Sequence, residues 1–371
     1  MHVETELRFS RIIVNLSRQE LRAMLQLAHC LYRLSQNPDY RQLVFPDLPE
    51  IARVDPGHGS LMMGYDFHLS EDGPRLIEVN TNAGGGYISW LSEKAAVASS
   101  PGINFARFEE RLHSSFLQEW HDFSGGNSPL TTVAIVDEDP EEQALYEEMI
   151  AYRDWLQGQG IATEVVAPQQ LQATAAGVFL GGRRIDLVYN RHCDFYLETA
   201  AMAGLKEAYL GRSVCLSPNP FAYGLLADKR RMILWSDAQA LQPLQLEPKE
   251  RELLLQMVPH TRLLADFATD DVWDQRKNYI FKPVASFGAK GVLMGKSVSR
   301  KRFAELDPQD TLVQQVILPA IQEGPGGEEY KSDIRLYVYR DRLLGIGARL
   351  YQGQVTNLRT EGGGFAPVRL R

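Results

Sequence analysis

The sequence predicts a mixed α/β fold that includes a small open α/β sheet. Three observations lead to this prediction. Residues 64–85 contain two short runs of alternating apolar and polar side chains around a polar turn, which is the pattern of a β-hairpin. Residues 131–190 alternate short apolar runs with a segment of helix length, as small open α/β sheets do. Residues 278–351 again contain short apolar runs, which predicts further strands.

The composition is that of a globular protein with two or three packed units. The chain has 371 residues, of which 44% are hydrophobic and 23% are charged. We expect residues 1–130 to contain helices and the hairpin, and residues 131–216 to form the small α/β unit. Residues 217–371 should carry the remaining strands and a glycine-rich loop. The stretch SGGNSP before residue 130 is expected to be a linker.

Charge and hydrophobicity exclude several classes of partner. The formal charge of −8 argues against binding to a nucleic acid backbone. No apolar run approaches the length of a membrane span, and the first residues do not resemble a signal peptide, so we expect a cytoplasmic protein without a membrane partner. The three cysteines, Cys30, Cys193 and Cys215, are scattered and should be reduced thiols.

The first segment is expected to begin with an amphipathic helix. Residues 17–34 have the apolar spacing of such a helix, with Ser17 as a candidate N-cap and Glu20 three residues later. Further helices are expected at residues 93–100 and 105–120.

The hairpin carries three oxygen-bearing side chains. Its strands are expected at Tyr65–Leu69 and Arg75–Asn80. Glu78 and Asn80 are two residues apart and share a face, and Asp66 on the partner strand can point to that same face. Adjacent carboxylates repel one another unless a cation lies between them, and Mg²⁺ prefers such ligands. Acidic hairpin residues also commonly face solvent, so this stretch alone leaves both interpretations open.

The second segment has the order of a small open α/β sheet. We expect a strand within residues 131–140, a helix over 141–157, and strands at 161–166, 177–185 and 186–190.

Arg191 follows the last of these strands. Ligands bind outside the carboxyl ends of strands in open α/β sheets, and a guanidinium group can hold both oxygens of a carboxylate. Arg191 is therefore a candidate substrate ligand, with a surface salt bridge as the alternative.

The third segment contains a candidate phosphate site. Lys282 ends an apolar run, and Gly288 and Gly291 lie in the loop that follows. Backbone amides of such a loop can approach phosphate oxygens, and the lysine can neutralise one of them. The pattern of a Walker loop is absent, and a tight hairpin with a nearby lysine remains the alternative.

Two more strand patterns follow. Residues 311–318 form an apolar run whose backbone could bind an adenine ring through its N–H and C=O groups. Residues 333–351 predict a hairpin that turns at 340–342.

The order of these motifs resembles an ATP-grasp ligase. The quoted pieces are LLADKRRMI, YIFKP with its glycine loop, LVQQVI, DIRLYVYRDRLLGIGARLY and TNLRTEGGG. Most members of that superfamily continue into a strand bearing Asp and a strand reading E-V-N. Here the chain ends, and the matching hairpin is the early one with Asp66, Glu78 and Asn80. The sequence thus resembles the circularly permuted ATP-grasp enzymes, eukaryotic-type glutathione synthetase and glutathionylspermidine synthetase.

The resemblance implies a role for individual residues. Metal ligands would be Asp66, Glu78 and Asn80. Nucleotide contacts would be Lys229, Lys282, Ser286, Gly288, Gly291, Gln314, Gln315 and Val316. Asp333 would occupy an acidic position that also contacts the nucleotide. The catalytic cations would be Arg349, Lys282 and Arg359, with Asn357 close to a further polar contact. Substrate contacts would be Arg191, Arg359, Asn82, Gly363 and Gly364, with Gly362 in the same loop. The cofactors would be ATP and one or two Mg²⁺ ions, with Mn²⁺ as an alternative.

Two residue differences from glutathione synthetase mean that the resemblance does not extend to glutathione as the product. Ser286 stands where that enzyme has a glutamate metal ligand, and residues 62–64 read Met-Met-Gly where it has an arginine. Both changes affect groups that would hold metal or substrate.

The function implied is an ATP-dependent carboxylate–amine ligase that works through an acyl phosphate. Its substrates would be a small carboxylate and an amine, such as an amino acid, a short peptide or a polyamine, and the related synthetases make a homodimer the expected assembly. Two alternatives remain: a small-molecule phosphotransferase and a non-catalytic nucleotide-binding protein.

Overall fold

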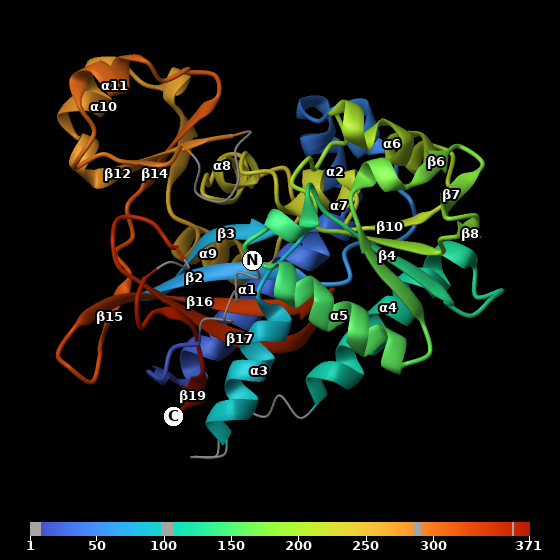
Figure 1. Ribbon diagram of the computed structural model, residues 1–371. Helices are drawn as coiled ribbons and strands as arrows, with labels where there is room; N and C mark the ends of the chain where they lie inside the picture. The colour runs from blue at the N-terminus through green and yellow to red at the C-terminus, as the bar shows by residue number, and fades with distance from the viewer. Residues whose placement is uncertain (1–8, 98–106, 285–290, 358–359) are drawn as a thin grey trace.

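The computed structural model describes residues 9–97, 107–284, 291–357 and 360–371 (Figure 1). Within them the strands form five sheets. The central sheet is antiparallel, in the order β18-β17-β16-β2-β3, and β15 also pairs with β16. Its strands are β2 (Met63–Ser70), β3 (Gly73–Asn80), β15 (Ala320–Glu323), β16 (Glu329–Tyr339), β17 (Arg342–Tyr351) and β18 (Gly364–Ala366).

Two hairpins from distant parts of the chain meet in this sheet. The predicted early hairpin is β2–β3, and the predicted late hairpin is β16–β17. They join where β2 pairs with β16, with Asp66 opposite Arg335. Strands from early and late sequence therefore form one continuous surface, as the permuted motif order predicts.

A smaller antiparallel sheet lies beside the central one, with α10 and α11 next to it (Figure 1). Its order is β11-β14-β12-β13. The bounds are β11 (Thr261–Leu263), β12 (Tyr279–Pro283), β13 (Leu293–Met294), β14 (Thr311–Gln315), α10 (Thr269–Asp274) and α11 (Arg300–Ala304).

The middle segment forms the predicted open α/β sheet, whose strands are parallel and have the order β10-β9-β4-β5. The bounds are β4 (Thr132–Val136), β5 (Ala162–Val166), β9 (Leu187–Asn190), β10 (Cys215–Ser217), α5 (Tyr146–Gly158) and α6 (Ala203–Leu210). The separate sheet β6-β7-β8 consists of β6 (Gln172–Thr174), β7 (Gly177–Leu180) and β8 (Arg183–Arg184).

Two predicted boundaries in this segment were wrong. The helix expected from Glu141 begins at Tyr146, because Asp139 has a positive φ of 40° and residues 140–142 form a short 3₁₀ turn. Residues 177–185 form two antiparallel strands rather than one. Gly181 and Gly182, with φ of 55° and 80°, make the tight turn between them.

The remaining helices surround the central sheet, and a short parallel pair, β1 with β19, joins the two ends of the described chain. Ser17 caps α1 in a capping box with Glu20, as predicted. The bounds are α1 (Arg18–Gln36), α2 (Pro38–Val44), α3 (Gly86–Val97), α4 (Phe108–Ser124), α7 (Pro220–Leu226), α8 (Arg231–Trp235), α9 (Pro248–Met257), β1 (Val14–Leu16) and β19 (Val368–Leu370).

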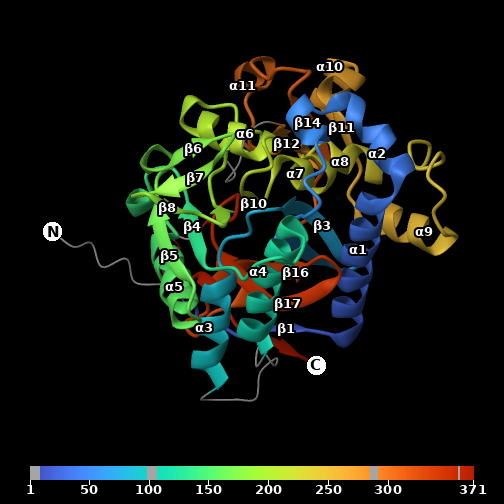
Figure 2. The ribbon, with the colours of Figure 1, turned by 90° about the vertical axis from the view of Figure 1, so that its right-hand side faces the viewer.

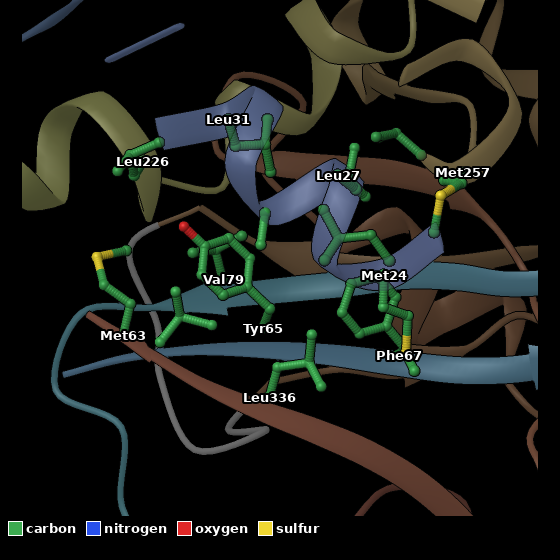
Figure 3. Packing of buried hydrophobic residues seen from close by; sticks show 14 of the residues in the cluster. Met24, Leu27, Leu31, Met63, Tyr65, Phe67, Val79, Leu226, Met257 and Leu336 are labelled. Atoms are coloured by element: carbon green, nitrogen blue, oxygen red, sulfur yellow. The ribbon is translucent and has the colours of Figure 1, made fainter. Parts of the chain in front are cut away.

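The main core lies between α1 and one face of the central sheet. Met24, Leu27 and Leu31 of α1 pack toward Tyr65 and Phe67 of β2 (Figure 3). On the other side of the sheet, α3 and α4 pack against β17 (Figure 2). Because side chains alternate along a strand, burial of Tyr65 and Phe67 directs the intervening residue 66 and residue 68 to the opposite face.

A β-bulge in β3 sets the direction of its polar side chains. Asp66 is opposite Glu78, but the next residue of β2, Phe67, is opposite Leu76, so Ile77 is an extra residue. The bulge allows Leu76 and Val79 both to enter the core. Glu78 lies between them and is only partly buried.

Candidate active site

A network of charged side chains occupies the face of the central sheet that does not carry α1. Asp66 lies on β2, Asp333 and Arg335 on β16, and Arg349 on β17. Strand register explains their meeting, since Asp66 is opposite Arg335 and Asp333 is opposite Arg349. All four side chains therefore project from neighbouring positions on three adjacent strands.

Both carboxylate oxygens of Asp66 bind guanidinium groups. Arg335 donates from Nε to Oδ1 at 2.5 Å and from Nη2 to Oδ2 at 2.6 Å. Arg349 donates from Nη2 to the same Oδ2 at 2.8 Å and from Nε to Asp333 at 2.7 Å. Thr356 donates a further hydrogen bond to Asp333 at 2.8 Å. Asp66 is 2% exposed, so this is a buried ion network.

The network holds Asp66 in its ionised form. Burial by itself raises the pKa of this carboxyl, but the charges of Arg335 and Arg349 and their hydrogen bonds outweigh burial and lower the pKa to about 2. Burial also acts against the charge of Arg349, and Asp333 and Asp66 raise its pKa well above the usual value. Asp66 and Arg349 therefore remain charged at neutral pH.

Glu78 and Asn80 lie beside this network. The Asn80 amide nitrogen lies 3.0 Å from Glu78 Oε1 and 3.4 Å from Asp66 Oδ2. The predicted grouping of these three residues on one face is therefore observed. Within the described residues, no three His, Cys, Asp or Glu side chains form a group that could hold a metal ion.

Of the three predicted metal ligands, Glu78 and Asn80 are better placed to bind a metal ion than Asp66. Glu78 and Asn80 are partly exposed and can offer side-chain oxygens. Asp66 has both oxygens in contact with guanidinium groups, so the predicted set of three ligands is reduced here to two. Asp66 is less available because the planar guanidinium group of Arg335 binds both of its oxygens and compensates its negative charge.

Two lysines face Glu78 from the neighbouring elements. Lys282 on β12 is 6% exposed and donates to the Ile77 carbonyl at 3.1 Å. Burial lowers the pKa of Lys282 to about 8, while Glu78 opposes this shift. Lys229 donates to the Pro283 carbonyl at 3.3 Å, and burial lowers its pKa too. A narrow hollow between the small and central sheets is lined by Glu78 and both lysines, and also by Gln314.

The strand expected to meet adenine is in place, but several of its groups have internal partners. The Gln314 side chain donates to Thr261 Oγ1 at 3.0 Å. The backbone N–H groups of Gln315 and Val316 donate to the carbonyls of His260 and Asn278, each at 2.9 Å. The side chain of Gln315 is exposed.

Part of the predicted phosphate loop lies outside the described residues. Ser286 and Gly288 belong to that part. Arg359, near the end of the chain, also lies outside the described residues. Gly291 is described and has a φ of 74°, which favours glycine. In the last glycine run, Gly362 and Gly364 have φ of 71° and 100°. A Cβ on Gly363 would approach the Leu350 carbonyl to 2.5 Å, so this turn packs directly on β17.

Arg191 is buried in internal contacts. Its guanidinium group pairs with Glu148 at 3.3 Å and donates to the Ala83 carbonyl and the Tyr189 hydroxyl, each at 3.0 Å. Asn82 donates to the backbone carbonyl of Arg191 at 3.1 Å. The alternative of a surface salt bridge was wrong, because the ion pair with Glu148 is buried. The role of Arg191 as a substrate ligand stays a prediction.

The partner of Arg191 also caps a helix. Glu148 accepts hydrogen bonds from the backbone N–H groups of Gly85 and Tyr87, at 2.9 and 3.0 Å, where α3 begins. Arg191 and Glu148 therefore fix the loop that follows Asn80 against the parallel sheet.

We expect Arg191→Lys to destabilise the fold. An ammonium group has three donors on a single nitrogen and cannot reach the three acceptors that Nη1 and Nη2 of Arg191 bind, so the loss should be roughly 1.5–3 kcal/mol in the free energy of unfolding. Denaturant unfolding monitored by circular dichroism measures this. Unchanged stability, together with a selective loss of kcat/KM for a carboxylate substrate, would instead support a substrate contact.

Comparison with solved structures identifies the architecture. A glutathione synthetase-like effector from Globodera pallida, in its apo form, superposes with a TM-score of 0.60 at 10% sequence identity, over 98% of this chain and 90% of that chain. The chain has a glutathione synthetase-like fold. A protein assigned as a gamma-glutamylcysteine synthetase from Methylobacillus flagellatus KT gives a weaker match, with a TM-score of 0.47 and 10% identity over 93% and 86% of the two chains. Neither a protein-family model nor a curated protein matches the sequence.

The glutathione synthetase-like fold confirms the fold class predicted from the sequence. Within the part of the chain that the structure describes, no helix is long and apolar enough to cross a membrane.

Arg335 and Thr356 belong to the charged network of this glutathione synthetase-like fold but were not predicted from the sequence. A signal for Arg335 was present, because Asp333 and Arg335 are two residues apart in a predicted strand and so share a face. Thr356 follows β17 in a loop, and no periodicity indicates that its hydroxyl turns back to Asp333.

Proposed function

We propose that this protein is an ATP-dependent ligase that joins a small carboxylate to an amine. The observation that carries the proposal is the convergence of four cations on one junction of a glutathione synthetase-like fold. Lys229 and Lys282 face Glu78 where the small sheet meets the central sheet, and Arg335 and Arg349 lie beside them around Asp66. Such an arrangement suits a polyphosphate with its counter-ion.

The two lysines are suited to the phosphates. Lys282 is buried and Lys229 is partly buried. Lys282 donates to the Ile77 carbonyl and Lys229 to the Pro283 carbonyl, and a backbone carbonyl competes weakly with a phosphate oxygen for an ammonium group. Glu78 and Asn80 would hold Mg²⁺, which when bound supplies positive charge between phosphate oxygens.

Arg349 is suited to the transferred phosphoryl group. Its Nε and Nη2 are held by Asp333 and Asp66, which fixes the plane of the guanidinium group. Within the described residues, Nη1 has no hydrogen-bond partner. A donor that is fixed before the reaction can stabilise developing charge without reorganisation. The substrate carboxylate would attack the γ-phosphate, and the amine would then displace phosphate from the resulting acyl phosphate.

The substrates are proposed by class. We infer an amino acid, a short peptide or a polyamine, and a homodimer is the assembly to test first.

The function is tested by incubating the protein with ATP, Mg²⁺ and pairs drawn from these classes, and by measuring ADP, orthophosphate and coupled product. A ligase releases ADP and phosphate together only when both substrates are present. ADP without phosphate identifies a phosphotransferase, and nucleotide binding without turnover identifies a non-catalytic protein.

We expect Lys282→Ala to weaken nucleotide binding. Loss of a buried ammonium beside the phosphates should raise the dissociation constant for a non-hydrolysable ATP analogue with Mg²⁺ by about tenfold or more. Isothermal titration calorimetry measures this. Lys277→Ala is the matched control, because Lys277 is exposed and precedes the same strand. Equal affinities for the two variants would remove Lys282 from the site.

A further inference from the structure

Residues 316–319 connect the small sheet to the central sheet. Two successive residues of this segment, Val316 and Ile317, make hydrogen bonds to different sides of the connection. The N–H of Val316 donates to the Asn278 carbonyl, next to β12 of the small sheet, at 2.9 Å. The carbonyl of Ile317 accepts a hydrogen bond from His68 Nδ1, on β2 of the central sheet, at 2.7 Å. The chain therefore crosses from the small sheet to the central sheet between Val316 and Ile317.

The histidine contact is a directed hydrogen bond. A carbonyl oxygen can only accept, so Nδ1 of His68 carries the proton in this contact. Packing contributes less to this segment, since Leu318 is 68% exposed and Ile317 is only partly buried. The position of the segment thus depends largely on its polar contacts.

His68 is placed by the same strand that carries Asp66. The two residues are two positions apart on β2, with Phe67 in the core between them, so their side chains leave the same face of the sheet. The extra residue of the bulge lies on β3, so the alternation along β2 is intact. One strand thus contacts both the charged network and the segment that follows the proposed adenine strand β14.

Lys282 makes a contact across the same junction in the opposite direction, from β12 of the small sheet to the Ile77 carbonyl of β3. In the proposed function this ammonium group moves to a phosphate oxygen when nucleotide binds. The Lys282 contact with Ile77 is then lost, whereas the His68 contact with Ile317 can persist.

We propose that His68 is a positioning residue that fixes residues 316–319 against β2 and so sets the distance between the adenine side and the phosphate side of the nucleotide site. The nucleotide part of this inference rests on the proposed function. The contact with Ile317 does not.

The first experiment tests the contact without nucleotide. His68→Leu removes the donor, and His68→Asn keeps one, because the Asn amide nitrogen is attached at Cγ as Nδ1 is in histidine. Hydrogen–deuterium exchange at the amides of residues 316–318 should become about three- to tenfold faster in His68→Leu and stay near the native rate in His68→Asn. Exchange in the parallel sheet, which lies away from the junction, should not change.

His260→Leu is the matched control. The His260 backbone carbonyl binds the N–H of Gln315, next to the same segment, but its side chain is exposed. This variant changes histidine to leucine nearby without removing a side-chain contact, so exchange should remain native. If His68→Leu also exchanges at the native rate, the proposed positioning role is wrong.

The second experiment tests the effect on the nucleotide. His68→Leu should raise both the KM for ATP and the dissociation constant of an ATP analogue about tenfold, with little change in kcat, because the charged network is untouched. His68→Asn should restore both values. Faster exchange combined with native ATP affinity would overturn the role in nucleotide positioning. If the wild-type protein binds no nucleotide, the proposed function fails, while the exchange result still decides whether His68 fixes the segment.

Discussion

Replacing Glu78 by Gln is expected to reduce kcat by about 10²-fold or more while leaving the fold intact, by analogy with the loss of one electrostatic contact to a transition state. Glu78 is the carboxylate of the site with the fewest internal contacts: Asn80 is its one hydrogen-bonding side chain among the described residues. It also faces both lysines. Its charge is therefore available for a metal ion, and neutralising it leaves the hydrogen bond from Lys282 to the Ile77 carbonyl in place.

The measurement is substrate-dependent ADP release, with thermal unfolding recorded on the same samples. Glu71→Gln is the matched control, because Glu71 is exposed in the turn of the same hairpin. A Glu78→Gln variant with native kcat would show that the hairpin does not hold the metal ion. A large fall in stability would show that Glu78 is structural.

Replacing Asp66 by Asn is expected to destabilise the fold strongly, in contrast to Glu78→Gln. Arg335 and Arg349 both bind this buried carboxylate, and removal of one member of a buried ion pair leaves uncompensated charge. The expected loss in the free energy of unfolding is about 3–5 kcal/mol. Denaturant unfolding measures this value, and Asp72→Asn, in the exposed turn of the hairpin, is the matched control.

A double-mutant cycle separates the contribution of Arg335 from that of Arg349. Asp66→Asn and Arg335→Met should each destabilise, and the double variant should lose less than the sum of the two, since each single change removes the same contact. Additive losses would show that Asp66 and Arg335 do not depend on each other. In that case Arg349 and Asp333 would carry the network.

Local sequence patterns were sufficient for the elements that carry the site. The two hairpins, the capping box at Ser17 and the parallel strands of the middle segment all follow from periodicity and turn residues. The shared face of Glu78 and Asn80 follows from their spacing. These features depend on interactions between residues that are close in sequence, and such interactions leave a readable pattern.

Local patterns were not sufficient for helix and strand boundaries in the middle segment. The helix begins at Tyr146 rather than Glu141, and residues 177–185 form two strands. A single positive φ at Asp139 and a pair at Gly181 and Gly182 decide both boundaries. Apolar periodicity does not report φ, and only the glycine pair had a recognisable turn signal.

By itself, the sequence determined that Asp66, Glu78 and Asn80 share one face of a hairpin and that Arg191 ends a strand. Only the tertiary structure decided which charges pair. Asp66 and Arg335 are 269 residues apart, and Arg191 and Glu148 are 43 residues apart. Alternation along a strand fixes the face of each side chain, but the neighbouring strand, and with it the partner charge, is chosen when the whole sheet assembles. An arginine at a strand end is thus equally compatible in sequence with a substrate carboxylate and with a buried glutamate, and packing of the loop after Asn80 selected the glutamate.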